Sequence, residues 1–453
     1  MLRLGFRGIF ALGMILVAFA CSPENTPSGA ARQSIDETRT ADCPGCLLRE
    51  RIKSAQPGET INIPAGTYTM TGGELVIDKD LTLVGEGAEV TVIQAAGSLD
   101  LSVHRVIRIA EGSVVSISRV TIRYGKESSK AMRMIPFHSE AIGMPSSGIE
   151  KISAEFGGGI YNQGTLALTD SIVTENYAGG GGGIFNGAKI TIKNSSITGN
   201  RAGGYGGGIF NGGVLHAANI VVEDNVAGAG AGINNWGEAF VIAATIKGNQ
   251  SNFTGGGIDN ASIGVLTLDS TTVSHNESPI GGGIDNFGRL QIINSTISNN
   301  TAKFGAGIDN RWMLTLANST ISGNIAREGG GLVMRSAVPS AGASIFNTIL
   351  SGNSAGRGPD CMGVVASLGH NLVGTDSGCE FIAVEWDSVG TKARPIDAKL
   401  GRLDFNGGPT ATNALLPGSP AIDAGDNGSC PPVDQRGVPR PRGTSCDIGS
   451  YER

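Results

Sequence analysis

The sequence has few charged and few aromatic residues, and it lacks the features of several protein classes. Charged residues make up 16% of the 453 residues and aromatic residues 5%. The formal net charge of −6 provides no basic surface of the kind that binds nucleic acid, so no nucleic-acid partner is predicted. The 71 glycines follow no Gly-X-Y period, which excludes collagen, and a hydrophobic share of 40% excludes a disordered chain.

Long hydrophobic runs are absent after the first twenty residues. Residues 9–20 form an apolar run after a basic start, too short to cross a membrane and typical of a signal peptide. The segment Ala18–Cys21 resembles the lipobox of bacterial lipoproteins, in which the cysteine is lipidated after cleavage. We therefore expect a signal peptide over 1–20, lipidation of Cys21 and a flexible tether over 21–42. A plain secretory signal is the alternative.

Cysteine is absent from residues 47–360. Apart from Cys21, the seven cysteines fall in three local pairs, and we expect each pair to form a disulfide in an oxidising compartment. The pairs are Cys43–Cys46, Cys361–Cys379 and Cys430–Cys446. Zinc binding at the first pair is the alternative, but it requires two further ligands nearby, and the five histidines are scattered. No metal site is therefore predicted at these cysteines.

The middle of the chain repeats a short motif, Gly-x-Gly-Ile, every 24 to 26 residues. The apolar residue that ends the motif recurs at Ile160, Ile184, Ile209, Ile233, Ile258, Ile284, Ile308 and Leu332. Each repeat contains two further short apolar–polar alternations and closes on an asparagine, at Asn176, Asn200, Asn225, Asn249, Asn276, Asn300 and Asn324. Without a helical period, this pattern predicts three short strands per repeat. The leucine-rich-repeat motif is missing, and WD40 blades are nearly twice as long.

The repeat predicts an all-β fold, a right-handed single-stranded parallel β-helix with about 24–25 residues per coil and a coil spacing of about 4.8 Å. Stacked Ile, Leu and Val fill such a core without many aromatic residues. Glycine fits the sharp bends, where φ is positive. Asparagine at a corner tolerates left-handed backbone and can form hydrogen bonds along a ladder.

Less regular coils are expected before the repeat, over residues 43–125, with Leu47–Ala55 as a short amphipathic helix that caps the open end. Residues 126–156 interrupt the coil pattern and are predicted as an insertion loop. Such a loop either contributes binding specificity or is a disordered excursion. Regular coils are expected over 157–358, and the last coils with a disulfide-bearing C-terminal cap over 359–453.

Motifs at both ends of the chain resemble those of a group of bacterial surface proteins. Cys46–Ile52, followed by Pro57–Ile61, is similar to the CSLREA-type N-terminal motif of surface β-helix proteins. The Gly-Gly-Gly-Ile-x-Asn repeats are similar to those of polymorphic outer-membrane proteins, and the tail, above all Leu416–Gly425 and Cys446–Gly449, resembles choice-of-anchor Q domains. The resemblance implies an exported β-helix held at the cell surface, and it carries no catalytic residues.

The residue x in Gly-Ile-x-Asn is predicted to point outward, because the Ile before it points inward and side chains alternate along a strand. We expect an exposed file of candidate ligand-binding residues, aromatic in its first three coils and acidic in its last three: Tyr161, Phe185, Phe210, Asn234, Asp259, Asp285 and Asp309. Aromatic faces bind sugar rings, and carboxylates one or two coils apart approach the separations used in glycoside hydrolysis. The file contains no Lys or Arg, which disfavours a lyase. Neighbouring carboxylates should also raise the pKa of Asp285.

These observations favour an exported, lipid-anchored surface protein that presents a rigid face for adhesion or glycan contact and is not an enzyme. The alternative is a carbohydrate-active enzyme, a polysaccharide lyase or a glycoside hydrolase, that uses the outward file; a surface without any ligand is also open. The expected location is the outer membrane or the cell surface. The expected partners are the membrane, through Cys21, and a glycan or a host-cell surface. We expect a monomer without a cofactor, with Ca²⁺ at the acidic positions as the alternative.

Overall fold

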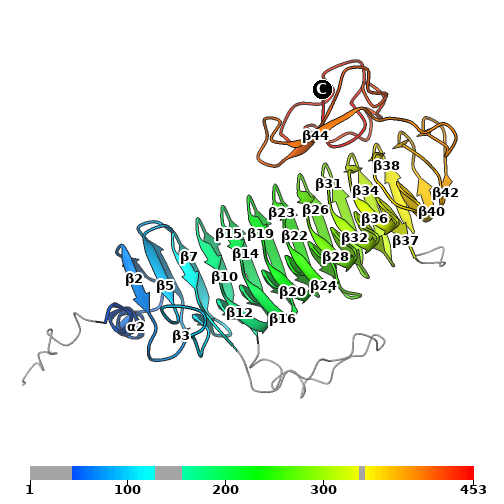
Figure 1. Cartoon of the computed structure of the whole chain (residues 1–453). Coiled ribbons are helices and arrows are strands. Elements are labelled where there is room, and N and C mark those ends of the chain that lie inside the picture. Colours follow the sequence, from blue (N-terminus) through cyan, green and yellow to red (C-terminus); the bar gives the residue numbers. More distant parts are fainter. Residues whose placement is uncertain (1–42, 128–155, 336–341) are drawn as a thin grey trace, which may run out of the picture. The chain divides into compact units, whose positions relative to one another are not determined.

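The computed structural model describes residues 43–127, 156–335 and 342–453 (Figure 1). The predicted signal peptide, Cys21 and the tether lie outside the described residues, as does the greater part of the predicted insertion, 128–155. Within the described ranges, no helix is long and apolar enough to cross a membrane. The chain forms a right-handed parallel β-helix, which confirms the fold predicted from the repeat.

The described chain begins with helix α2 (Pro44–Ser54). Pro44 occupies the first turn, where backbone N–H groups have no intrahelical acceptor, so a proline costs no hydrogen bond. Leu48 and Ile52 are 5% and 2% exposed and belong to the same apolar core as Ile61 of the first strand. The helix therefore covers the N-terminal end of the core, which confirms the predicted capping helix.

The first coils are less regular than those that follow. Their strands are β1 (Glu59–Ile63), β2 (Gly66–Thr69), β3 (Leu75–Ile77), β4 (Leu81–Gly85), β5 (Thr91–Gln94), β6 (Ile107–Ile109), β7 (Val114–Ser118) and β8 (Thr121–Arg123). These strands pair in parallel with the equivalent strands of the next coils, for example β4 with β7 and β5 with β8. The early segments therefore belong to the same β-helix.

Each regular coil contains four strands, which form four faces. Face 1 holds the Gly-Ile-x-Asn strands β9 (Ile160–Asn162), β13 (Ile184–Asn186), β17 (Ile209–Asn211), β21 (Ile233–Asn235), β25 (Ile258–Asn260), β29 (Ile284–Asn286), β33 (Ile308–Asn310) and β37 (Leu332–Met334). Face 2 holds β10 (Thr165–Thr169), β14 (Lys189–Lys193), β18 (Val214–Ala218), β22 (Glu238–Ile242), β26 (Val265–Asp269), β30 (Arg289–Ile293), β34 (Met313–Ala317) and β38 (Ala343–Phe346). The alternation of apolar and polar residues predicts these two sets of strands correctly.

Face 3 holds β11 (Ile172–Thr174), β15 (Ser196–Thr198), β19 (Val221–Glu223), β23 (Thr245–Lys247), β27 (Thr272–Ser274), β31 (Thr296–Ser298), β35 (Thr320–Ser322) and β39 (Ile349–Leu350). Face 4 holds β12 (Tyr177–Gly180), β16 (Arg201–Tyr205), β20 (Val226–Ala229), β24 (Gln250–Thr254), β28 (Glu277–Ile280), β32 (Thr301–Phe304) and β36 (Ile325–Glu328). The prediction of three strands per repeat was therefore one too few. Face 4 has no regular apolar alternation because its segments are rich in glycine and polar residues.

The apolar core is built from inward residues that stack from coil to coil. The Ile or Leu of every Gly-x-Gly-Ile motif has 0% exposure, from Ile160 to Leu332. The bend between faces 4 and 1 needs a glycine with positive φ, as predicted: Gly281 has φ +62°, and an added Cβ would lie 2.7 Å from the Cβ of Asp285. This tight bend decides how much of face 1 is open to solvent.

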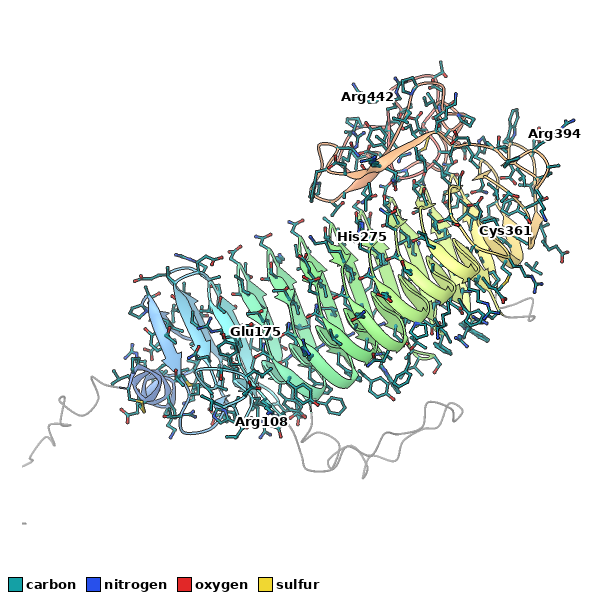
Figure 2. All side chains as sticks on the ribbon, viewed as in Figure 1. Arg108, Glu175, His275, Cys361, Arg394 and Arg442 are labelled. Carbon is teal, nitrogen blue, oxygen red and sulfur yellow. A yellow bond between two sulfur atoms is a disulfide. The ribbon has the colours of Figure 1, made fainter. Side chains whose placement is uncertain are left out.

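Two asparagine ladders run along the β-helix. In the predicted ladder, Asn176 to Asn324, each Nδ2 donates to the Oδ1 of the asparagine one coil further on, at 2.9 to 3.1 Å. The left-handed backbone lies one residue earlier than predicted, for example at Glu175 (φ 53°) and His275 (φ 55°), both labelled in Figure 2. The second ladder, Asn162 to Asn310 on face 1, was not predicted; its bonds measure 2.6 to 2.8 Å. Both ladders satisfy amide groups that are almost fully buried.

The last coils contain β40 (Cys361–Ser367), β41 (Leu372–Val373), β42 (Cys379–Ile382) and β43 (Ser388–Val389). The chain then turns back along face 3 as the antiparallel hairpin of β44 (Leu400–Asp404) and β45 (Thr412–Leu415), followed by an irregular tail (Figure 1). Threonines of face 3 meet this segment: Thr296 Oγ1 donates to Gln435 Oε1 at 2.6 Å, and Ser450 N donates to Thr320 Oγ1 at 3.1 Å. The tail therefore covers the side of the last coils. All three predicted cysteine pairs form disulfides.

Candidate functional site

The outward file of face 1 is largely buried, which corrects the prediction of an exposed surface. Asp285 and Asp309 have 0% exposure, Asn234 1%, and Tyr161 and Asp259 3% and 5%. Phe185 and Phe210 are half-buried. The side chains do point away from the apolar core, as strand alternation requires. They are covered because the glycine bend brings face 4 against them and because side chains from neighbouring coils lie over them.

The aromatic part of the file forms a continuous stack of rings. The ring centroids of Tyr161 and Phe185 lie 5.0 Å apart, those of Phe185 and Phe210 5.4 Å, and those of Phe210 and Trp236 6.2 Å, all in stacked geometry. Phe156, which ends the predicted insertion, lies over two of them, at 4.9 Å from Phe185 and 5.3 Å from Phe210. We call these five rings the aromatic platform.

The platform is buried at one end and open at the other. At the buried end, the Arg105 guanidinium lies 4.6 Å from the Tyr161 ring centroid and also pairs with Glu74 and Glu127. At the open end, Trp236 is 37% exposed. Tyr205 of face 4 stands edge-on to Trp236 at 6.2 Å. The platform therefore offers a flat apolar surface to solvent at Trp236.

The acidic part of the file consists of three carboxylates in register, which we call the carboxylate row. Asp259, Asp285 and Asp309 are direct partners on β25, β29 and β33. Thr254 Oγ1 donates to Asp259 Oδ2 at 2.7 Å. Asp285 Oδ2 has no hydrogen-bond partner among the described residues, and Asn234, one coil before the row, has none for either side-chain amide atom.

Two arginines cover the carboxylate row. Arg335 Nε donates to both carboxylate oxygens of Asp309, at 2.7 and 2.8 Å. Arg311 Nε lies 3.4 Å from Asp285 and 3.6 Å from Asp309. The row therefore has cations beside it, although the file itself contains none, and the argument against a lyase from the absence of Lys and Arg no longer holds.

The arginines lie two residues after x, a position that sequence reasoning did not consider. This position directly follows the end of each face 1 strand, and from it Arg311 and Arg335 reach the carboxylate row. It is occupied by Gln163, Gly187, Gly212, Trp236, Ala261, Phe287, Arg311 and Arg335. Reading every second residue would have found both the arginines and the exposed tryptophan.

Burial and like charge both raise pKa values in the row. Desolvation raises the pKa of Asp259 to about 6, although Thr254 and Arg311 oppose the rise. Burial raises the pKa of Asp285 well above its ordinary value, and the neighbouring charges of Asp259 and Asp309 raise it further. The predicted direction for Asp285 is confirmed, but burial, not repulsion between carboxylates, is the larger cause.

A cation site in the row finds no direct support in the geometry. Among the residues that the structure describes, no three His, Cys, Asp or Glu side chains are grouped so that they could hold a metal ion. Asp309 is already engaged by Arg335. Binding of Ca²⁺ at Asp259 or Asp285 therefore stays an untested alternative.

Comparison with known proteins finds similarity to solved structures only. No family model and no curated protein matches the chain. Pectate lyase Pel9A aligns with 89% of this chain and 90% of its own at 13% identity and a TM-score of 0.47. The catalytic domain of a GH87 alpha-1,3-glucanase variant in complex with nigerose covers 82% of this chain and 67% of its own, at 14% identity and a TM-score of 0.44. A PL6 alginate lyase in complex with a trisaccharide covers 84% and 89%, at 10% identity and a TM-score of 0.39. These similarities concern the fold and bear on no residue of the site.

Proposed function

We propose that this chain is an exported surface protein that binds a polysaccharide on the aromatic platform. The observation that supports this function is the stack of rings, one per coil, that ends in the half-open Trp236. Sugar rings present apolar C–H faces that pack against aromatic rings, and a rigid platform loses little conformational entropy on binding. The proposal includes attachment to the outer membrane or cell surface through Cys21, as the lipobox resemblance implies.

Burial of the carboxylate row favours binding over cleavage. A carboxylate with 0% exposure, such as Asp285 or Asp309, does not contact a substrate in this conformation. The bidentate ion pair of Asp309 with Arg335 holds that side chain in place. The carboxylate row therefore has a structural role beside the platform, while the rings provide the contact surface.

The test is affinity electrophoresis of the wild type and of Trp236→Ala over a panel of neutral and acidic polysaccharides. We expect one class of polysaccharide to retard the wild type and a loss of retardation of at least tenfold in the variant. Trp312→Ala is the matched control, because Trp312 is 43% exposed but outside the platform. Equal retardation of both variants and the wild type would contradict the proposal.

Cleavage of a glycosidic bond is the second candidate, favoured by the raised pKa of Asp259 next to Asp285. Their coil spacing of about 4.8 Å approaches the separation of about 5–5.5 Å between the two carboxyl groups of retaining glycosidases. An enzyme would release reducing sugars or unsaturated uronates from the polysaccharide that binds, and Asp259→Asn would abolish that release. Absence of both products over the panel excludes this candidate.

A further inference from the structure

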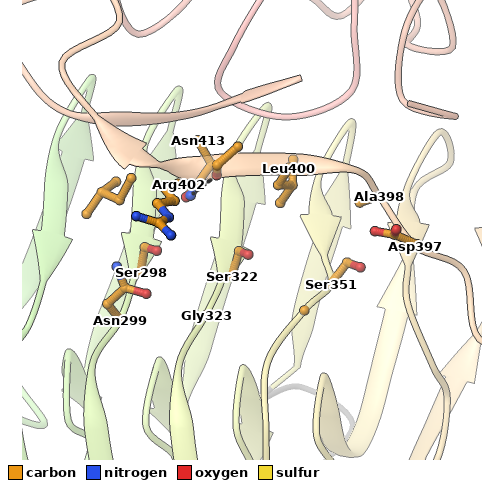
Figure 3. A pocket seen from close by; sticks show the side chains of 13 residues that line it. Ser298, Asn299, Ser322, Gly323, Ser351, Asp397, Ala398, Leu400, Arg402 and Asn413 are labelled. Carbon is orange, nitrogen blue, oxygen red and sulfur yellow. Dashed lines mark hydrogen bonds between the residues drawn. The ribbon is translucent and has the colours of Figure 1, made fainter. Parts of the chain in front are cut away.

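A polar cleft lies on another face of the β-helix, between face 3 of the last coils and the hairpin of β44 and β45 (Figure 3). Its volume is about 450 Å³, within the usual range for small-molecule sites. Three serines from successive coils form its floor: Ser298, Ser322 and Ser351. Ser298 and Ser322 are direct partners in register. Since each coil adds about 4.8 Å, the floor spans about 10 Å.

Two buried polar atoms in the lining of this cleft lack partners. Ser298 is 1% exposed, and its Oγ has no hydrogen-bond partner among the described residues. Asn413 of β45 is 5% exposed; its Nδ2 donates to the carbonyl of Gly401 at 2.9 Å, but its Oδ1 has no such partner. Buried polar atoms in native proteins are nearly always satisfied. Both residues line the cleft, and each has unused hydrogen-bonding capacity that a polar molecule bound there can meet.

Opposite charges mark the two ends of the cleft. Figure 3 shows the Arg402 guanidinium directed toward Ser298 and Asn413, whereas Asp397 lies at the far end beside Ala398. One oxygen of Asp397 accepts the Lys399 N–H at 2.8 Å, and the residue is exposed. A guanidinium binds a carboxylate through two parallel hydrogen bonds.

The small floor residues occur only under and next to the hairpin. The equivalent positions of the four coils farther from it carry larger or charged side chains: Thr174, Thr198, Glu223 and Lys247. Glu223 and Lys247 form an ion pair of 2.8 Å across that surface. Serine at the later positions keeps the space under the hairpin open and lines it with hydroxyl groups.

We infer that this cleft binds a short acidic saccharide, of about two sugar units, with its carboxylate on Arg402. Sugar hydroxyls both donate and accept hydrogen bonds, so they satisfy Asn413 Oδ1, Ser298 Oγ and the Asp397 carboxylate together. A disaccharide matches the length of the floor. This site is separate from the aromatic platform and does not depend on the proposed function.

The inference is tested by isothermal titration calorimetry on the full chain with digalacturonic acid as the acidic probe and cellobiose as the neutral one. We expect digalacturonic acid to bind the wild type at least tenfold more tightly than cellobiose. Arg402→Gln, which removes the cation from an exposed position, should reduce the affinity at least tenfold, and Ser322→Val, which removes a floor hydroxyl, should also weaken it. Arg394→Gln is the matched control, an exposed arginine outside the cleft lining, and should bind like the wild type.

The variants also separate this site from the platform. Trp236→Ala should leave the affinity for digalacturonic acid unchanged, whether or not this variant still binds a polysaccharide at the aromatic platform. Three results would overturn the inference: no binding of digalacturonic acid to the wild type, equal binding of the neutral probe, or unchanged affinity in Arg402→Gln. Thermal unfolding of each variant shows whether the fold is kept. Because Arg402 is exposed, we expect Arg402→Gln to fold, and this variant still tests the inference if Ser322→Val does not fold.

Discussion

Replacing Asp259 by asparagine should change how stability depends on pH. The folded-state pKa of Asp259 is raised to about 6 from its ordinary value of 3.8, chiefly by burial. The folded protein therefore holds this proton more tightly than the unfolded chain does. The protonated acid contributes its full stability below about pH 3.8, and this contribution is lost as the pH rises through about 6.

The size of the effect follows from the gap between the two pKa values. At about 1.4 kcal/mol per pH unit, ionising Asp259 in the folded state costs about 3 kcal/mol by pH 7. Asparagine has a similar shape, can still accept the hydrogen bond from Thr254 and carries no charge. Asp259→Asn should therefore match the wild type near pH 4 and exceed its free energy of unfolding by up to about 3 kcal/mol at pH 7.

The assay is urea unfolding of both proteins between pH 4 and pH 8, followed by circular dichroism. Asp100→Asn, which removes an exposed carboxylate, serves as the control. The reasoning is refuted if the difference between Asp259→Asn and the wild type stays constant across this range, or if the variant becomes relatively less stable as the pH rises.

Four further changes test the other parts of the structure. Arg335→Gln should lower the free energy of unfolding by about 3–5 kcal/mol, because it leaves Asp309 buried and charged, and urea titrations should show that adding Asp309→Asn restores most of the loss. Asn249→Ala interrupts a ladder and should cost at least about 2 kcal/mol by the same measurement, since it leaves buried partners unsatisfied. Asp285→Asn should not lower the melting temperature, and a Ca²⁺-dependent gain in the wild type that this variant lacks would overturn the cation-free interpretation of the row. Cys21→Ser should release the protein from the membrane fraction, and unchanged membrane association would contradict the lipid anchor.

The 24- to 26-residue period was sufficient to predict the fold. A period of this length with Ile at one fixed position places that residue inward in every coil, and the structure buries each one fully, from Ile160 to Leu332. The hydrogen bonds between corner asparagines were predictable for the same reason, since a polar residue repeated at the end of a strand lies next to the equivalent residue of the next coil. Leu48 and Ile52 predicted the capping helix through their helical spacing.

Alternation also predicted which side chains leave the core, but it could not predict which of them reach solvent. Whether x is exposed depends on the bend at residues such as Gly281, which brings the backbone of face 4 against face 1. It depends as well on long side chains from the next coil, since Arg335, which directly follows β37, lies over Asp309 from 26 residues later in the chain. Strand alternation concerns the residues within one strand, whereas the glycine bend and the covering side chains involve residues outside that strand.

The tertiary structure alone decided where the C-terminal tail lies. Motifs in residues 359–453 predicted a disulfide-bearing end to the β-helix, but the contacts of Gln435 with Thr296 and of Ser450 with Thr320 join positions 139 and 130 residues apart. The tail that covers the hydroxyl groups of face 3 does not repeat, so the period of the sequence does not show which residues contact them. The polar cleft between face 3 and the hairpin exists only because these distant segments meet, so the sequence determined the β-helix and its inward residues, while the packing of the tail created the second site.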